Sequence, residues 1–435
     1  MKNCLLLTKN CLLRSVAVPA GISLLTIIFS CSPGKRDESG EPDFASEAFI
    51  REKIAGQMVI LEKNVRERLD EQPEMPGPGK PFLPRNLNEE GEIRLVTAAD
   101  WCSGFYPGCL WLMVEHTGNE HWEPLARDYT AKLESQQWNT SDHDIGFRMM
   151  CSFGNGYRLT GDSTYRDILI RSARSLITRY NDTVGCIRSW DWNEEVWEYP
   201  VIIDNMMNLE LLFFATRETG DSVYHRIADR HAHTTLVNHF REDNSAYHVL
   251  DYDPETGEVL ARTTHQGYSD ESAWARGQAW GLYGYTMTYR FTKDPRYLEQ
   301  AEKIALFTLQ HPNLPKDLIP YWDYDAPGIP DEPRDASAAA ITASALLELA
   351  RYSSSGERYQ DAAMRILESL SSPEYLSVDG ENRGFLLDHS TGHRTAGSEV
   401  DCPIIYADYY FLEALKRVNR NPTRKMALVP KTMVR

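Results

Sequence analysis

The chain has 435 residues and a formal net charge of −17, with 42% hydrophobic and 25% charged residues. This composition is that of a folded protein and excludes a wholly disordered chain, a collagen-like fibre and a polytopic membrane protein. The acidic excess also argues against a nucleic-acid partner, which requires a basic surface. The length fits two domains or one large barrel.

The N-terminal residues have the pattern of an export signal. Three basic residues precede an apolar run at 16–29, which is shorter than a membrane span and leads to Cys31. The pattern resembles a bacterial lipoprotein signal, so we expect residues 1–30 to be removed and Cys31 to carry a lipid. An uncleaved anchor and a plain signal peptide are the alternatives. A lipid on Cys31 would anchor the protein in the bacterial cell envelope, at the periplasmic face or the cell surface.

Residues 31–43 contain Pro, Gly and alternating charges, which predicts a flexible tether. Of the eight cysteines, two would leave with the signal and one would be lipidated. The remaining five are an odd number without Cys-x-x-Cys spacing, so we expect neither a disulfide framework nor a structural zinc site. Most of them should be small core residues.

A turn pattern recurs along the rest of the chain, as in Thr160-Gly161-Asp162 followed by Tyr165. In such a turn, Gly can end one helix and Asp or Asn can cap the next. A more apolar helix precedes each turn and an amphipathic helix follows it, so the repeating unit is a helical hairpin.

The hairpins predict a ring. The inner helices are expected at 104–116, 145–159, 205–218, 276–291, 337–352 and 407–418, and the helix at 46–69 can close the circle. We therefore predict an all-α fold, an (α/α)6 barrel over residues 44–422, with a C-terminal tail at 423–435. An open solenoid is the alternative, but the irregular spacing of the turns suits a closed barrel better.

Polar residues cluster just before each predicted inner helix. The clusters include Asp100-Trp101, Asp142-His143-Asp144, Asp204-Asn205, Trp274-Ala275-Arg276, Arg334-Asp335 and Gly397-Ser398-Glu399. Parallel helices would bring these clusters to one mouth, where free N–H groups favour an anion. Trp101, Trp190, Trp192, Trp274 and Trp280 add flat apolar faces. Carboxylates beside aromatic faces indicate a sugar site rather than a pocket for an apolar ligand.

Each aspartate also has a plainer explanation. Asp144, Asp204 and Asp335 could be helix N-caps and nothing more. Because Trp, His and amide groups accompany Asp144 and Asp204, we favour a functional role for these two.

The basic side chains have plain explanations as well. His143 could be a loop hydrogen-bonding group, and Arg276 could pair with any nearby acid. His231 and His233, on an outer helix, are expected to form a solvated face, because no third metal ligand is evident. We expect no metal site and no cofactor.

Five segments together resemble a known family. They read Asp-His-Asp-Ile-Gly-Phe at 142–147, Ile-Asp-Asn-Met-Met-Asn-Leu at 203–209, Thr-His-Gln-Gly-Tyr at 264–268, Ser-Ala-Trp-Ala-Arg-Gly-Gln-Ala-Trp at 272–280, and Asp-Cys-Pro-Ile-Ile-Tyr-Ala-Asp-Tyr-Tyr at 401–410. In this order they resemble the unsaturated glucuronyl hydrolases, glycoside hydrolase family 88. The resemblance extends from about residue 44 to residue 420, and its motifs are specific only in combination.

The resemblance implies a reaction and its acids. The substrate would be an oligosaccharide already cut by a polysaccharide lyase, with a 4,5-unsaturated hexuronic acid at its non-reducing end. The enzyme would hydrate the vinyl ether, with Asp204 as the general acid that protonates carbon 4 and then helps activate water. Asp144 would hold the ring hydroxyls and assist the developing charge. The carboxylate-separation rules for retaining and inverting enzymes then do not apply.

The resemblance also implies the binding residues. Those contacting the uronate would be His248, Gln266, Arg276 and Trp280, and those lining the pocket would be Trp101, His143, Trp190 and Trp274. Trp192 lies two residues beyond Trp190. Arg276 is the natural partner of the substrate carboxylate because its planar fork suits one. Ser398 falls near the family's residues for sugars beyond the cleaved bond.

Two other functions remain open from the sequence. One is the related unsaturated rhamnogalacturonyl hydrolase activity, on the same fold with a comparable aspartate. The other is a non-catalytic glycan-binding surface lipoprotein, which would need the tryptophans but not Asp144, Asp204 and Arg276 together. The combined motifs favour a hydrolase of glycosaminoglycan-type fragments.

Overall fold

The computed structural model describes residues 47–71, 79–80 and 82–419, all within one unit that begins at Asp43. The predicted export signal, Cys31, the tether and the tail lie outside the described residues.

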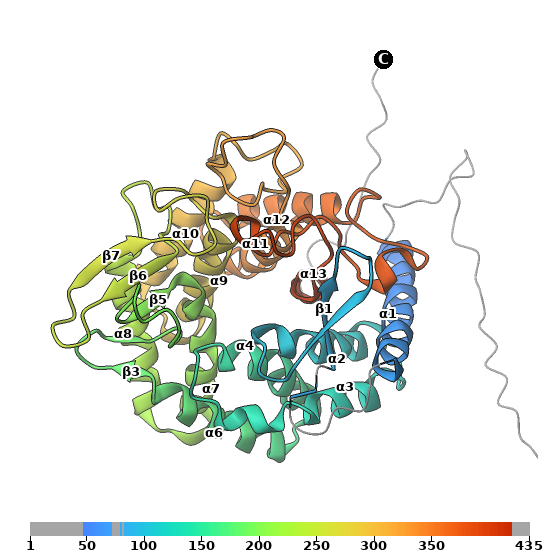
Figure 1. Ribbon diagram of the computed structural model, residues 1–435, viewed down its shortest axis with the longest axis horizontal. Coiled ribbons are helices and arrows are strands. Elements are labelled where there is room, and N and C mark those ends of the chain that lie inside the picture. Colours follow the sequence, from blue (N-terminus) through green and yellow to red (C-terminus); the bar gives the residue numbers. More distant parts are fainter. Residues whose placement is uncertain (1–46, 72–78, 81, 420–435) are drawn as a thin grey trace, which may run out of the picture. The chain divides into compact units, whose positions relative to one another are not determined.

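Six helical segments form the inner ring of the barrel (Figure 1). They are α2 (Phe105–Thr117), α4 (Ile145–Met149) continued by α5 (Asn155–Thr160), α7 (Leu209–Thr219), α9 (Ala275–Thr292), α11 (Ala336–Leu349) and α13 (Ile405–Asn419). A helix that is apolar on all sides is buried on all sides, and every residue of α11 is buried. The predicted inner helices are confirmed, except that a π-helical turn at Met150–Gly154 interrupts the second.

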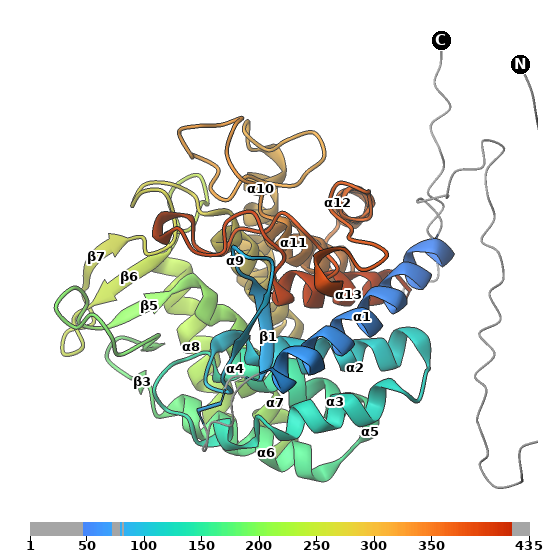
Figure 2. The same cartoon turned by 45° about the vertical axis from the view of Figure 1, so that its right-hand side comes forward.

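The outer helices cover the inner ring. They are α1 (Glu47–Asp70), α3 (Trp122–Ala131), α6 (Ser163–Ile177), α8 (Ser222–Asn238), α10 (Pro295–Gln310) and α12 (Gly356–Leu370). Helices α3, α6, α8, α10 and α12 each pack against the inner helix that precedes them, and α13 packs against both α11 and α2, which closes the ring. Helix α1 lies against α2, as Figure 2 shows.

The predicted turn chemistry explains how each hairpin reverses. Asp162, Asp221 and Asp294 each accept a hydrogen bond from the backbone N–H two residues ahead, and so cap α6, α8 and α10. Glycines in the left-handed conformation follow α2, α5 and α7. In the fourth hairpin Lys293 takes this role, with φ of 58°.

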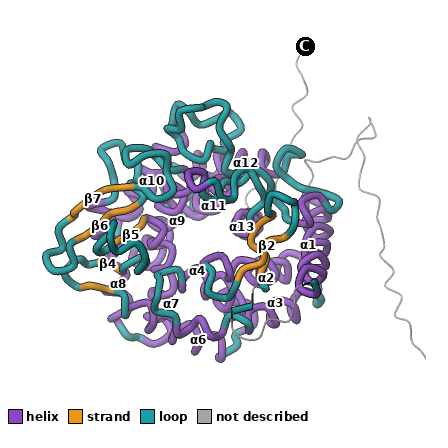
Figure 3. The backbone as a smooth tube through the Cα atoms, viewed as in Figure 1, coloured by secondary structure: helices purple, strands orange, loops and turns teal. Residues whose placement is uncertain are grey.

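In the described part of the chain, seven short strands that the sequence did not reveal lie around the barrel (Figure 3). They form the hairpins β1 (Leu83–Leu87)–β2 (Ile93–Val96) and β3 (Tyr180–Asn181)–β4 (Cys186–Ile187), and the antiparallel sheet β5 (Pro200–Ile202)–β6 (Val249–Tyr252)–β7 (Val259–Thr263). In the three-stranded sheet, Ile202 pairs with Val249 and Val249 with Thr263. This register places the residues that follow β5, precede β6 and follow β7 side by side.

Two expectations about single residues have different outcomes. The described cysteines are all free, and Cys102, Cys109, Cys151 and Cys186 are buried, so the prediction of core cysteines is confirmed. The prediction of a solvated face is wrong for His231. That side chain is buried, and its Nδ1 accepts a 3.0 Å hydrogen bond from the backbone N–H of Ile187, which ties α8 to β4.

In the described part of the chain, no helix has the length and apolarity to cross a membrane.

Candidate active site

The two predicted acids lie at helix starts without capping them. Asp144 directly precedes α4 and Asp204 lies in the first turn of the 3-10 segment Ile203–Asn208, and neither start has a side-chain cap. Asp335, in contrast, accepts the backbone N–H groups of Ser337 and Ala338 at 3.1 and 3.3 Å. The cap explanation therefore holds for Asp335 only, and the carboxyls of Asp144 and Asp204 remain available for chemistry.

The Asp204 carboxyl keeps its proton up to near neutral pH. Burial raises the pKa of its carboxyl to about 7, against the opposing effects of the Arg276 charge and a backbone N–H. Its Oδ2 is buried and has no hydrogen-bond partner in the described part of the structure. Only 9% of the residue is exposed. A carboxyl with these properties can act as a general acid.

Asp144 lies within a charged group of side chains. Burial raises its pKa well above the ordinary value, and the charges of Asp142 and Asp204 add to this, whereas Arg148 opposes it. Asp142 is itself paired with Arg148 at 2.6 Å. The His143 ring lies 3.2 Å from Asp144 through Nε2, and burial lowers the His143 pKa to about 3, so this imidazole is neutral.

The tautomer of His248 follows from its hydrogen bonds. Its Nδ1 accepts the backbone N–H groups of both His265 and Gln266, each at 3.1 Å. Burial lowers the His248 pKa well below the ordinary value. The neutral ring therefore carries its proton on Nε2, which lies 3.8 Å from Oδ2 of Asp204. Trp274 fixes the ring plane at a centroid distance of 4.5 Å.

Arg276 is buried and held by several acceptors. Its Nη1 donates to Asp335 at 2.9 Å and to the carbonyl of Thr391 at 2.6 Å, and its Nη2 donates to the carbonyl of Gly392. The guanidinium lies over Trp274 at 4.5 Å. These contacts leave the Nε–H and one Nη2–H, so Arg276 both joins the loop at 391–392 to the barrel and retains donors.

Aromatic rings form the wall and the floor of the site. Trp101, half-buried, lies 5.0 Å from Tyr406 between ring centroids. Trp280 is fully buried and packs against Phe147 and Tyr410 at 5.1 and 5.3 Å. Trp280 is therefore part of the apolar floor beneath the acids, not an exposed face.

Trp190 belongs to an aromatic group that the sequence only partly indicated. Its ring stacks on Trp192 at 4.6 Å and 14°. Trp197 packs edge-on against Trp190 at 5.4 Å, and His265 lies 5.8 Å away. Trp190 is 7% exposed and Trp192 is 45% exposed, so Trp192 presents the open ring.

The loop that carries Ser398 reaches over the mouth. Gln266 donates to the carbonyl of Gly392 at 3.0 Å, and His393 Nε2 contacts the carbonyl of His265 at 2.9 Å. Ser398 pairs with His393 through both backbone hydrogen bonds. Ser398 thus lies on the loop that covers Gln266 and His265, and no hydrogen bond joins it to either acid among the described residues.

An ion-paired group at the mouth was missed by sequence reasoning. Arg85, from β1, pairs with Glu399 at 2.8 Å through Nη2 and with Asp100 at 2.9 Å through Nη1. It ties the turn carrying Trp101 to the Ser398 loop. Arg85 stands in no motif and lies 314 residues from Glu399, so no spacing pattern could have indicated that contact.

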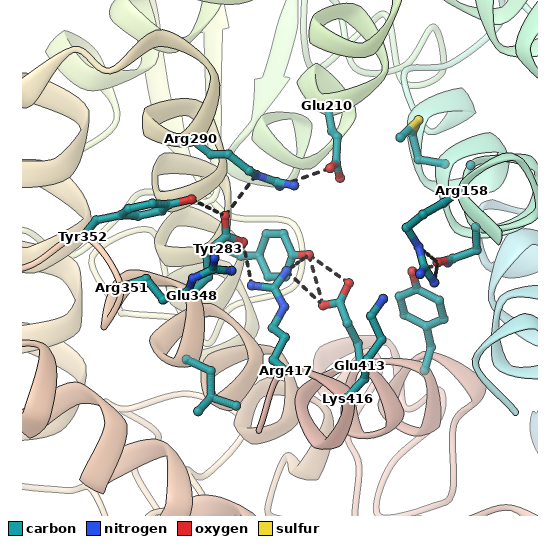
Figure 4. Close-up of a pocket in the computed structure, with 15 residues that line it drawn as sticks. Arg158, Glu210, Tyr283, Arg290, Glu348, Arg351, Tyr352, Glu413, Lys416 and Arg417 are labelled. Atoms are coloured by element: carbon teal, nitrogen blue, oxygen red, sulfur yellow. Dashed lines mark hydrogen bonds and ion pairs between the residues drawn. The ribbon is translucent and has the colours of Figure 1, made fainter. Parts of the chain in front are cut away.

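A second polar pocket, of about 360 Å³, lies at the opposite end of the barrel (Figure 4). Arg290 and Arg417 stand in the last turns of α9 and α13. Both pair with Glu348, at 2.9 and 2.5 Å, and Arg290 also pairs with Glu210 at 3.0 Å. Burial would raise the Glu348 pKa, but Arg417 and Arg290 hold it below the ordinary value. This network is structural, since its charges neutralise one another.

The described part of the chain contains no group of three or more His, Cys, Asp or Glu side chains placed to hold a metal ion. What the site offers is a buried carboxylic acid, a second carboxyl, a neutral imidazole donor and a guanidinium, between aromatic walls. Contacts join Asp204 to His248, His248 to Trp274 and Trp274 to Arg276, while Asp144 contacts His143.

Comparison with known proteins places this geometry in a family. The profile of Glycosyl Hydrolase Family 88 matches residues 84–422. An unsaturated glucuronyl hydrolase from Formosa agariphila is 53% identical over 337 residues, covering 77% of this chain and 84% of that protein.

Solved structures agree with the sequence relatives. The crystal structure of an unsaturated glucuronyl hydrolase specific for heparin has a TM-score of 0.80 at 46% identity, covering 86% of this chain and 97% of the other. An Asp-to-Asn variant of the Streptococcus agalactiae enzyme, complexed with dGlcA-GalNAc6S, has a TM-score of 0.67 at 30% identity, covering 84% and 91%. The chain therefore belongs to glycosyl hydrolase family 88 and is a glycosidase built on an (α/α)6 barrel.

Proposed function

We propose that this glycosidase releases 4,5-unsaturated glucuronic acid from the non-reducing end of lyase-generated oligosaccharides of the glycosaminoglycan type. The observation that carries the proposal is Asp204, a buried carboxyl with a pKa of about 7 and an unpartnered Oδ2 beside the His248 donor. The relatives named above support the substrate class.

The chemistry begins with proton transfer to carbon. Asp204 delivers its proton to carbon 4 of the unsaturated ring, the carbon–carbon π bond breaks, and positive charge develops at carbon 5 and the ring oxygen. A vinyl ether accepts a proton on carbon only from an acid that is still protonated, which the raised pKa of Asp204 provides.

Water completes the reaction. The Asp204 carboxylate takes a proton from water as the water oxygen bonds to carbon 5, which restores the acid. The hydrated ring opens to a ketone at carbon 5, and the hemiacetal left at carbon 1 releases the shortened oligosaccharide. In this proposal Asp144, whose carboxyl lies 3.2 Å from the neutral His143 ring, holds ring hydroxyls and assists the developing charge.

The remaining donors suit the carboxylate of the substrate. Arg276 has N–H groups beyond those that bond Asp335, Thr391 and Gly392, and a guanidinium binds a carboxylate more strongly than a neutral donor does. His248 and Gln266 belong to the same hydrogen-bonded group.

The test follows the double bond. The double bond is conjugated with the carboxylate and absorbs ultraviolet light, and hydration removes that absorbance. The Asp204→Asn variant should fold and bind an unsaturated disaccharide while kcat falls by at least about 10²-fold, because positioned acid catalysis contributes roughly 10²–10⁴. The exposed cap variant Asp221→Asn is the matched control and should keep wild-type kcat. Near-wild-type kcat in a folded Asp204→Asn protein would refute the assignment.

We also propose a lipid anchor and a place in a reaction sequence. The pattern around Cys31 supports attachment to the bacterial cell envelope, and Cys31→Ala should release the protein from membranes or block its processing. A wild-type protein that remains in the soluble fraction with an intact N-terminus after export would contradict this. The substrate double bond is the product of β-elimination, so a polysaccharide lyase must act first.

A further inference from the structure

A rigid aromatic surface stands exposed beside the active site. One face of the Trp192 indole is covered by the parallel ring of Trp190, and Trp197 packs against its edge at 5.6 Å. His265 also contacts Trp192, at 5.0 Å. With 45% of its surface exposed, Trp192 offers a flat apolar face that its neighbours hold in one orientation.

This surface is continuous with the catalytic acids. The ring of His265 lies 6.3 Å from that of His248, and Nε2 of His248 lies 3.8 Å from Oδ2 of Asp204. Two imidazole rings, those of His248 and His265, thus stand between Asp204 and Trp192 in this series of contacts. Among the described residues, no ring contact, hydrogen bond or ion pair joins Trp192 to Asp204, Asp144 or Arg276, so a sugar on Trp192 lies beyond the group that surrounds the unsaturated ring.

The edge of the surface also suits a sugar. Glu194 and Glu195 are exposed on the same short segment, and Arg188 lies 3.9 Å from the Glu194 carboxylate. The aromatic face can pack against the C–H groups of a sugar ring. The carboxylates and the guanidinium at its edge can form hydrogen bonds with the sugar hydroxyls.

We propose that Trp192 is the platform for the second sugar on the reducing side of the cleaved bond. This inference rests on the proposed function and extends it: the enzyme distinguishes oligosaccharides by length as well as by their unsaturated end. The ligand is a pyranose ring of the substrate, stacked on the open indole face.

The experiment compares two substrate lengths. Initial rates are measured for the wild type and Trp192→Ala on an unsaturated disaccharide and on the corresponding unsaturated tetrasaccharide. The variant should lose about tenfold in kcat/KM on the tetrasaccharide, chiefly through a higher KM. A loss of this size is expected because the sugar no longer buries one apolar indole face. On the disaccharide the loss in kcat/KM should be clearly smaller, because that substrate does not reach Trp192 and is affected only through the ring that Trp192 stacks on, Trp190.

Two further variants make the result decisive. Trp192→Phe keeps a flat ring and should retain most of the tetrasaccharide activity even if Trp192→Ala disturbs the stack. Trp138→Ala removes a tryptophan that is 66% exposed but lies against Arg171 of the outer helix α6. This control variant should have wild-type kcat/KM on both substrates.

Unchanged tetrasaccharide kinetics in Trp192→Ala would overturn the proposal, and so would equal losses on both substrates. Those outcomes are distinct from failure of the proposed function, in which the wild type would process neither substrate.

Discussion

Replacing Asp204 with Asn should stabilise the protein, and more so as the pH rises. The folded state holds the Asp204 proton up to a pKa of about 7, whereas an unfolded chain loses it near the ordinary value of 3.8. A carboxyl with a raised pKa in the folded state contributes stability at low pH, and that contribution disappears as the pH rises through the window between these values. At about 1.4 kcal/mol per pKa unit, the full cost of ionising Asp204 in the folded protein is about 4 kcal/mol. This is an upper limit, because 9% of Asp204 remains exposed.

The measurement is urea unfolding of wild type and Asp204→Asn at about pH 5 and about pH 8. Between these two pH values, the difference in unfolding free energy between the two proteins should change by roughly 2–3 kcal/mol. Asn is nearly isosteric with a protonated carboxyl, so the two proteins should differ little at the lower pH. At the higher pH the variant should be the more stable. Asp221→Asn removes an exposed cap carboxylate and serves as the control, since Asn caps as well as Asp. A stability difference between wild type and Asp204→Asn that is the same at both pH values would refute the proposed burial of Asp204.

Four other outcomes are expected. The wild-type kcat on an unsaturated disaccharide should fall as the pH rises through about 7, because Asp204 then loses the proton it must donate; a rate that is flat to high pH would contradict this. Arg276→Ala should raise KM for the charged substrate by roughly 10- to 100-fold and affect an uncharged methyl ester less, as kinetics on both substrates will show. Glu348→Gln should cost about 3 kcal/mol in unfolding experiments near neutral pH while activity is retained, because it leaves Arg290 and Arg417 without their shared partner. Since the Glu348 pKa is lowered, this deficit should shrink as the pH falls below 4.5, and a deficit that grows instead would show that the ion pairs are not its source. Activity should survive prolonged EDTA treatment, and loss that one divalent ion restores would show that the site had been misjudged.

The sequence predicted the barrel because local chemistry repeats. Asp162, Asp221 and Asp294 each lie two residues after the end of one helix and cap the next helix. This local pattern can be recognised without knowledge of distant contacts. The polar clusters were equally visible, because parallel helices bring their N-termini to one end. These clusters contain Asp144, Asp204 and Arg276, whereas His248 and Gln266 were indicated only by the family resemblance.

What the sequence did not reveal depends on contacts between distant segments. Arg85 meets Glu399 across more than three hundred residues, and His248 owes its tautomer to two backbone N–H groups of another strand end. His231 looked like part of a solvated face, since helical periodicity alone cannot show that β4 covers α8. The pKa of Asp204 likewise arises mainly from burial, which no local pattern encodes.

The aromatic floor at Trp280 makes the active site a dead end. Trp280 of α9 packs against Phe147 of α4 and Tyr410 of α13, and these three buried rings fill the space between alternate inner helices. A polysaccharide therefore cannot thread through the ring at this level, and only a chain terminus can reach Asp204. The enzyme therefore cleaves only at the end of a chain and removes one sugar unit at each encounter. The two products must also leave through the same opening, the shortened oligosaccharide first and the keto acid after it.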